Sequence, residues 1–226
     1  MKSQKETKES RRRYHDACGA AHGLELIGER WALLVLRELM LGPKRFSAIR
    51  ADLPGISAKV LTERLEGLEA DGLVIRRQLP PPASAWVYEA TAWGLEAEPI
   101  MQALGRWAVR SPNHDPTMPI SPVSLLLSFR TMLDPMRVGD LDLRIGFRFP
   151  TDTYVGHLTR DGFAIARGDP DDADLTLIGT APAIGALVHG GVPVEQSGVT
   201  VTGNIDLVGR FATLFPLPPK VATGNS

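Results

Sequence analysis

The sequence has a single cysteine, Cys18, and therefore cannot form a disulfide within one chain. This agrees with a reducing compartment, and any disulfide would have to join two chains. Long apolar runs are also missing: stretches such as Trp31–Leu36 and Val123–Leu127 are far shorter than the roughly 20 residues that a membrane-spanning helix needs. The polar N-terminal residues have no apolar segment behind them, so we expect no secretory signal there. We expect a cytoplasmic protein with no membrane partner.

Motifs of enzyme and metal chemistry are missing as well. The five histidines are scattered without metal-ligand spacing, and there is no Gly-x-Ser-x-Gly elbow, His-Glu-x-x-His motif or phosphate-cradling loop. Four acidic residues lie within Asp169–Asp174 around Pro170, where a cation could bind, but we interpret the segment as a solvated turn. We therefore expect no catalytic site, no metal and no cofactor.

Charge is unevenly distributed over the 226 residues, a length that favours two compact domains. Residues 1–113 carry 17 Lys and Arg against 14 Asp and Glu, a balance of +3, whereas residues 114–226 carry 8 against 12, a balance of −4. A small basic excess does not establish nucleic-acid binding, because a polyanion responds to the local arrangement of basic groups. Composition predicts two unlike globular halves. The positions of the basic residues must decide whether either half binds nucleic acid.

The first half has the pattern of a winged helix. Behind a polar arm at residues 1–16, apolar periodicity predicts helices over residues 17–27, 31–41, 46–53 and 57–70. Two strand-like runs follow at residues 73–79 and 86–91, separated by a stiff proline-rich loop, and then a helix from about Gly94 to Val109. Short helices, a capped helix and a β-hairpin in this order are typical of a winged helix-turn-helix.

The fourth of these helices is amphipathic and capped. Ser57 is a good N-cap, because its hydroxyl can accept a hydrogen bond from an unpaired backbone N–H of the first turn. A single apolar stripe at i, i+4 and i+7 is formed by Leu61, Leu65 and Leu68. Lys59 and Glu63 point away from this stripe, so the helix has one face for the core and one for a partner.

A proline-rich segment at residues 111–119 predicts a short linker between a domain at 17–110 and a domain at 120–226. In the second domain we expect helices at about 121–134, 182–189 and 205–215, and strands at 141–149, 153–159, 163–167, 175–178 and 199–202. The fold class is therefore α+β throughout, with an N-terminal winged helix and a C-terminal α+β domain.

Several short motifs occur together in the first half: Cys18, Leu26–Trp31, Leu36–Leu39, Gly42–Phe46, Leu53–Ser57, Leu61–Leu65, Leu68-Glu69 and Gly72–Val74. These motifs give residues 17–109 a resemblance to the HxlR family of bacterial winged-helix regulators. It implies a homodimer that binds double-stranded DNA, with the dimer built from residues around 18–27 and 94–109. The proline that follows the family cysteine is replaced here by Gly19, which puts any cysteine-based role in doubt.

A second set of motifs lies in the C-terminal half: Ala173–Leu177, the helix with Leu187 and Gly190, and Val201–Asn204 followed by Phe211 and Leu214-Phe215. With these motifs the second half resembles the sterol carrier protein 2-like domain. In that family a mixed sheet and helices enclose an apolar cavity for a lipid-like ligand. The resemblance implies an apolar small-molecule effector, but the identity of such a ligand does not transfer with a fold.

The winged-helix interpretation assigns DNA contacts to residues of three elements. The major groove admits one α-helix, so Lys59, Thr62 and Glu63 are expected to read base edges, with Ser57 and Arg64 at the margins. Lys44 and Arg45, at the start of the third helix, are expected to meet a phosphate. Of Arg76 and Arg77, alternation along a strand allows at most one to face DNA directly. The alternative is that these residues are ordinary solvated charges.

Cys18 has two interpretations. It could act as a redox sensor through an intermolecular disulfide, or it could be a buried small apolar side chain, which we favour. Its neighbours His15, Asp16 and His22 offer no strong cluster that would stabilise a thiolate.

The favoured mechanism is a dimer that places two recognition helices about 34 Å apart on a pseudo-palindromic operator, with a ligand in the second domain altering that spacing. A second hypothesis makes the C-terminal half a lipid or small-molecule carrier and the N-terminal half mainly a dimerisation module. A hydrolase is the third, and the missing motifs argue against it.

Overall fold

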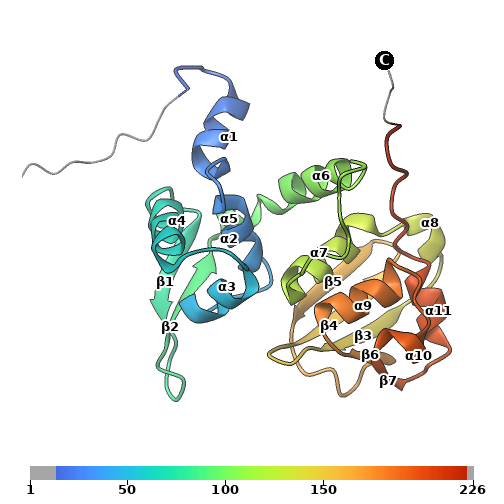
Figure 1. The fold of residues 1–226 in the computed structure, drawn as a ribbon. Coiled ribbons are helices and arrows are strands. Elements are labelled where there is room, and N and C mark those ends of the chain that lie inside the picture. The colour runs from blue at the N-terminus through green and yellow to red at the C-terminus, as the bar shows by residue number, and fades with distance from the viewer. Residues whose placement is uncertain (1–13, 223–226) are drawn as a thin grey trace, which may run out of the picture.

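The computed structural model describes residues 14–222, so residues 1–13 of the predicted arm lie outside the described part. The N-terminal elements are α1 (Gly19–Ile27), α2 (Ala32–Glu38), α3 (Phe46–Asp52), α4 (Ala58–Ala70), β1 (Val74–Gln78), β2 (Trp86–Ala90), α5 (Ala92–Leu95) and α6 (Glu98–Ala108). Figure 1 shows α2, α3, α4 and the hairpin grouped together, with α1 projecting away from them. The mixed α and β content and the winged helix-turn-helix of the N-terminal half are thereby confirmed.

The hairpin is antiparallel and in register from the pair Val74–Ala90 to the pair Gln78–Trp86. Lys44, just before α3, extends it by an isolated bridge to Tyr88, so the start of α3 is tied to the second strand. This bridge fixes the helix-turn-helix against the wing through backbone hydrogen bonds rather than through side chains.

The prediction of one helix starting at about Gly94 and ending at Val109 is wrong at its N-terminal end. The structure has two helices there, α5 and α6. The Thr91 hydroxyl caps the short α5 by accepting a hydrogen bond from the Gly94 N–H at 3.0 Å. Pro99 then lies in the first turn of α6. Proline has no N–H to donate and its fixed φ suits the first turn, so a new helix begins there.

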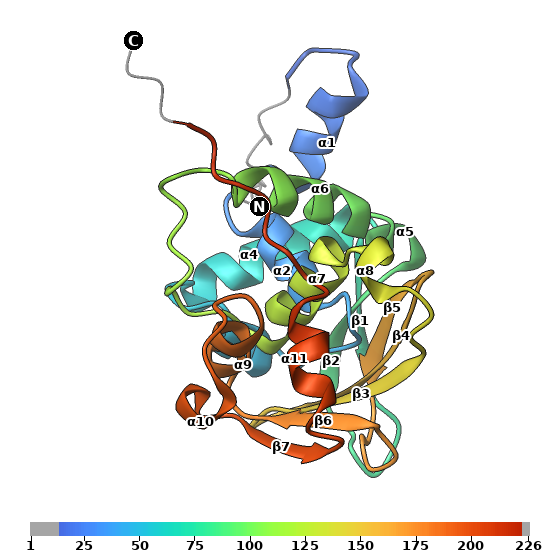
Figure 2. The same ribbon diagram turned by 90° about the vertical axis from the view of Figure 1, so that its right-hand side faces the viewer.

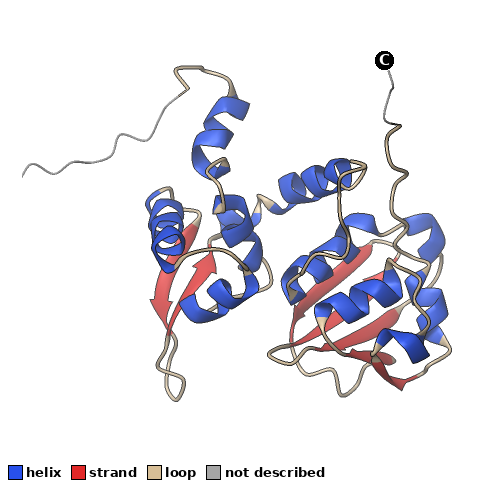
Figure 3. Cartoon of the chain, viewed as in Figure 1, coloured by secondary structure: helices blue, strands red, loops and turns tan. Residues whose placement is uncertain are grey.

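The C-terminal half is a five-stranded sheet with helices. Its elements are α7 (Pro122–Met132), α8 (Pro135–Val138), β3 (Leu143–Arg148), β4 (Thr153–Thr159), β5 (Gly162–Arg167), β6 (Leu175–Ile178), α9 (Ala181–Val188), α10 (Val194–Ser197), β7 (Thr200–Gly203) and α11 (Leu207–Ala212). The strand order is β5-β4-β3-β6-β7, with β3 and β6 parallel and the other neighbours antiparallel. Figure 3 shows the helices gathered on one face of this sheet.

Aromatic rings fill the space between the sheet and these helices. Phe129 of α7 lies with its ring centroid 5.9 Å from Phe147 of β3 and 4.9 Å from Phe215. Phe211 of α11 contacts the same three rings. All four side chains are almost completely buried, so this core is closely packed at its centre.

Two short helices, α8 and α10, were not predicted. The side chain of Asp134 accepts a hydrogen bond from the Met136 N–H at the start of α8. Gly198 ends α10 in a left-handed conformation. Single-turn helices have too few residues to show periodicity, so only their end signals were present in the sequence.

The two halves pack through α7, which contacts both α2 and α6. The chain also returns to the N-terminal half at its end, where the Val221 N–H donates to the Arg110 carbonyl at 2.8 Å. Figure 2 shows this C-terminal tail running past the end of α6. Within residues 14–222, no helix is both long and apolar enough to cross a membrane.

Candidate nucleic-acid interface

Helix α4 turns its apolar stripe inward and leaves its opposite face at the surface. The stripe residues Leu61, Leu65 and Leu68 are almost completely buried, and α4 contacts α2 and β1. The Ser57 cap is confirmed, because the hydroxyl accepts a hydrogen bond from the Val60 N–H at 3.2 Å. The core contacts and the cap together hold the first turns of α4 in a fixed orientation at the protein surface.

Lys59, Thr62 and Glu63 lie exposed on the outer face of α4. The Lys59 side chain is 87% exposed, and its ammonium is 3.9 Å from the Glu63 carboxylate. An exposed i, i+4 pair contributes only about 0.3–0.5 kcal/mol, so both groups can exchange it for contacts with DNA. The Thr62 hydroxyl donates to the Ala58 carbonyl at 3.1 Å, which leaves its oxygen able to accept a second hydrogen bond.

Arg64 turns away from this face. Its Nε donates to the Arg30 carbonyl at 3.0 Å, and its Nη2 lies 3.5 Å from the Glu29 carboxylate. The guanidinium therefore holds α4 against the turn between α1 and α2. In this position Arg64 orients the helix and does not point toward a groove.

The prediction that Lys44 meets a phosphate is wrong, because its side chain is buried. Only 1% of the side chain is exposed, and Nζ lies 2.8 Å from Glu38 Oε2 and 2.5 Å from Asp52 Oδ2. Two carboxylates compensate the cost of removing the ammonium from water, so the sequence motif Gly42–Phe46 supplies one structural cation here.

Arg45 and Arg50 are the exposed basic residues of α3. Arg45 is the N-cap residue of that helix, and Arg50 lies in its last turn. Arg45 was predicted from the sequence and Arg50 was not, although a basic residue on the outer side of a helix next to the recognition helix was the available signal.

The two arginines of the wing lie on opposite faces of the hairpin, as alternation predicted. The Arg76 guanidinium stacks over the Trp86 ring at 4.7 Å and lies 6.0 Å from the Tyr88 ring. Arg77 pairs with the Glu89 carboxylate on the other face. Glu89 neutralises Arg77, which leaves Arg76 as the exposed cation of the wing that no carboxylate pairs among the described contacts.

Cys18 is exposed, so the prediction of a buried side chain is wrong. It stands at the N-cap position of α1, a helix that has no buried residue in a single chain. The N–H groups of Ala20 and Ala21 point toward the thiol and lower its pKa, although the side chain does not close a capping hydrogen bond. This backbone contribution was not predicted, because the sequence shows charged neighbours of a cysteine but not the direction of its backbone N–H groups.

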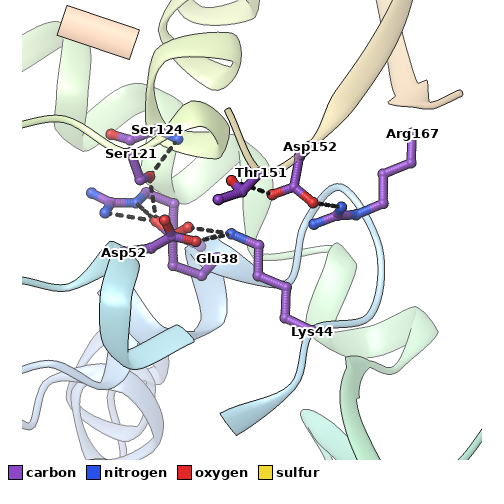
Figure 4. A network of polar contacts seen from close by, with 9 residues as sticks. Glu38, Lys44, Asp52, Ser121, Ser124, Thr151, Asp152 and Arg167 are labelled. Atoms are coloured by element: carbon purple, nitrogen blue, oxygen red, sulfur yellow. Dashed lines mark hydrogen bonds and ion pairs between the residues drawn. The ribbon is translucent and has the colours of Figure 1, made fainter. Parts of the chain in front are cut away.

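A buried polar cluster joins the two halves, and we call Arg37, Glu38, Lys44, Asp52 and Ser121 the Glu38 joint. Glu38 is fully buried and accepts hydrogen bonds from Lys44, from Arg37 at 2.9 Å and from the Ser121 hydroxyl at 2.7 Å. Burial raises the pKa of Asp52. Figure 4 shows these side chains converging beside a second pair, Asp152 and Arg167. A glutamate inside the apolar helix 32–38 was the sequence signal for this cluster.

The Ser121 hydroxyl has two roles in the joint. It donates to Glu38 of α2 and accepts a hydrogen bond from the Ser124 N–H at 3.0 Å, which caps α7. The first turn of α7 is thereby held to the helix that precedes the helix-turn-helix. A displacement of α7 would disturb the only two hydrogen bonds described for this hydroxyl.

Metal-ligating side chains are not grouped in the described part of the chain: no three or more of its His, Cys, Asp and Glu residues could hold one ion. Within the acidic turn, Arg148 lies 3.0 Å from Asp169 and also contacts Asp171. These contacts support the interpretation of Asp169–Asp174 as a turn stabilised within the protein.

Comparisons with known proteins concern the N-terminal half. Residues 26–115 match a family model described as HxlR-like helix-turn-helix. The chain is 42% identical over 94 residues to the HTH-type transcriptional regulator YkvN of Bacillus subtilis, covering 40% of this chain and 77% of that protein. It is 40% identical over 83 residues to the regulator YodB of the same organism, covering 37% and 74%. A structure of reduced YodB is 34% identical over 44% of this chain and all of that one, with a TM-score of 0.39.

Proposed function

The chain belongs to the HxlR-like helix-turn-helix family of transcriptional regulators, and from this premise we propose that it binds a pseudo-palindromic operator as a homodimer. The observation that supports this most directly is the geometry of α4. Its leucines anchor it inward, its N-terminus is capped, and its polar face is open to solvent. A helix presented in this way fits the major groove of duplex DNA.

Base reading is assigned to the first turns of α4. Lys59 can donate to guanine, Glu63 can accept from cytosine, and Thr62 can bond to either kind of group. Phosphate contacts are assigned to Arg45 and Arg50 on one side, and Arg76 extends the basic surface along the wing. Ser57 lies at the margin, where its side chain already caps the helix.

Lys59→Ala is expected to weaken operator binding about tenfold, within the 1–3 kcal/mol of a lost base or phosphate contact. The measurement is a footprint titration on DNA from upstream of the protein's own gene, repeated at several salt concentrations because phosphate contacts weaken with salt. Arg160→Ala is the matched control, since it removes one exposed cation from the turn between β4 and β5. Equal affinities for Lys59→Ala and Arg160→Ala would remove Lys59 from the interface.

The dimer surface is proposed from exposed apolar side chains on α1 and α6. Ile100, Leu104 and Trp107 form one stripe of α6 and are 54%, 47% and 72% exposed. Leu24 of α1 is 52% exposed. A soluble protein rarely leaves large apolar side chains clustered at its surface unless a partner covers them. A second copy of the chain would bury both helices and bring two α4 helices onto one face.

Cys18 is proposed as a reactive thiol beside this surface. Iodoacetamide is expected to modify it with a half-maximal rate at a lower pH in the folded protein than in the unfolded one. The reason is that the α1 backbone N–H groups stabilise the thiolate only in the folded state, so the folded pKa is the lower one. The chain has no other cysteine, so mass spectrometry reports this site alone. Coincident pH profiles would show that α1 does not activate the thiol.

For the C-terminal half we propose a sterol-carrier-like domain at 120–226, joined by a linker at 111–119 to a DNA-binding and dimerisation domain at 17–110. An apolar small molecule would act as effector by changing the spacing of the two α4 helices. The mixed sheet with helices on one face supports this proposal. The carrier alternative has less support, because phenylalanine rings occupy the centre of this domain.

A further inference from the structure

A crevice of about 230 Å³ lies where α2, α6 and α7 meet. Its walls include Leu33 and Leu34 of α2, Met101 and Gly105 of α6, and Leu127 and Met132 of α7. The crevice is therefore formed by both halves of the chain. It lies on the side of α6 that faces α7, and Leu104 of the exposed stripe lines its edge.

The crevice is apolar, and several polar side chains at its margins already have partners. The Gln102 amide donates to Glu98 at 2.9 Å, and Arg130 pairs with the same carboxylate at 2.9 Å. The Ser128 hydroxyl donates to the Leu125 carbonyl at 2.6 Å and lies 2.9 Å from His189 Nε2, and Ser124 lines the crevice one turn earlier on α7. The Ser124 hydroxyl, together with the remaining acceptor capacity of the Ser128 oxygen, gives one hydrogen-bonding edge to an otherwise apolar space.

We propose that this crevice, and not the C-terminal core, is the effector site, and that it binds a compact ring compound with one hydroxyl or amino group. An apolar cavity of about 150 Å³ can hold benzene, so the larger volume here suits a fused two-ring compound. The serine edge would receive the single polar group. The proposal rests on the proposed function, because it names the ligand class and location of the effector.

The C-terminal core offers no comparable space at its centre. The rings of Phe129, Phe147, Phe211 and Phe215 contact one another, and each side chain is no more than 2% exposed. A ligand there would have to displace closely packed rings. The crevice needs no such displacement, since its side chains already line an open space.

The walls of the crevice include residues linked to the proposed dimer surface and to the Glu38 joint. A ligand between α6 and α7 sets the position of α6, and Leu104 belongs both to the wall of the crevice and to the proposed dimer surface. Arg37 lines the crevice and also donates to Glu38 in the joint that holds α7 to α2. Occupancy can therefore alter the spacing of the two α4 helices and change affinity for an operator reciprocally.

The test uses 2-naphthol as probe and the full chain. Calorimetry is expected to give a Kd of about 100 µM, an ordinary affinity for a ligand of this size. Gly105→Leu should raise that Kd at least tenfold, because a Cβ at Gly105 meets no atom within 4 Å and a larger side chain would enter the crevice. Gly209→Leu is the matched control: it lies in α11, is exposed and is equally unobstructed.

Footprinting with and without 2-naphthol then tests the effector role. The expected result is at least a threefold change in operator affinity for the wild type and for Gly209→Leu, and none for Gly105→Leu. Three results would overturn the site. They are absence of probe binding to the wild type, equal probe binding to Gly105→Leu, and a Gly105→Leu protein whose dimer is already weakened when no probe is present. Probe binding that leaves operator affinity unchanged would overturn the effector role. A protein that binds the probe in the crevice but no DNA would instead refute the proposed function.

Discussion

Glu38→Ala is expected to lower the free energy of unfolding by about 3 kcal/mol, at the lower end of the cost of breaking a buried ion pair. Glu38 is fully buried and accepts from Lys44, Arg37 and Ser121, so its removal leaves buried donors without their acceptor. Lys44 retains Asp52 at 2.5 Å, which limits the loss. Urea unfolding followed by circular dichroism measures the effect.

The control is Glu63, an acidic residue that pairs with a lysine at the protein surface. Glu63→Ala removes an exposed partner of Lys59 and is expected to change stability by less than about 0.5 kcal/mol. The triple variant Glu38→Leu, Lys44→Met and Asp52→Leu should recover most of the stability, since Lys44 pairs with both carboxylates and removing all three charges leaves none of them unpaired. A single variant as stable as the wild type would mean that water reaches the joint and that Glu38 does not link the halves.

The residues of α4 show what local sequence can predict. The spacing of its leucines predicted the buried face, and Ser57 predicted where the helix begins, because both signals are contained within one helix and its N-cap. Lys44 and Arg64 were assigned to DNA because they are basic and lie close to α4 in the chain. Their partners Glu38, Asp52 and Glu29 come from other elements, and such pairings depend on the tertiary fold.

Cys18 and α6 show a second limit. A cysteine near apolar residues was interpreted as buried, but α1 has no buried residue in the single chain. The same apolar pattern predicts burial whether the side chains pack against their own chain or against a second copy of it. Only the three-dimensional structure separates the two cases, since it shows which apolar side chains of α1 and α6 remain exposed.

Ile100→Asp is expected to convert the proposed dimer to a monomer and to lower operator affinity about 100-fold or more, because two linked half-site contacts become independent ones. Ile100 lies in the exposed stripe of α6, 54% exposed, so a charge is harmless in a monomer but would be buried without a partner in a dimer. Light scattering measures the mass, and footprinting measures the affinity.

Met136→Asp is the matched control for this variant, because Met136 is a 79% exposed apolar side chain on α8, far along the chain from α6. It should leave both the mass and the affinity at wild-type values. Circular dichroism should show both variants folded, since neither side chain contributes to the buried core. If Ile100→Asp remains a dimer with normal affinity, the stripe of α6 is not the surface that joins two copies, and the pair of α4 helices must be arranged by another face.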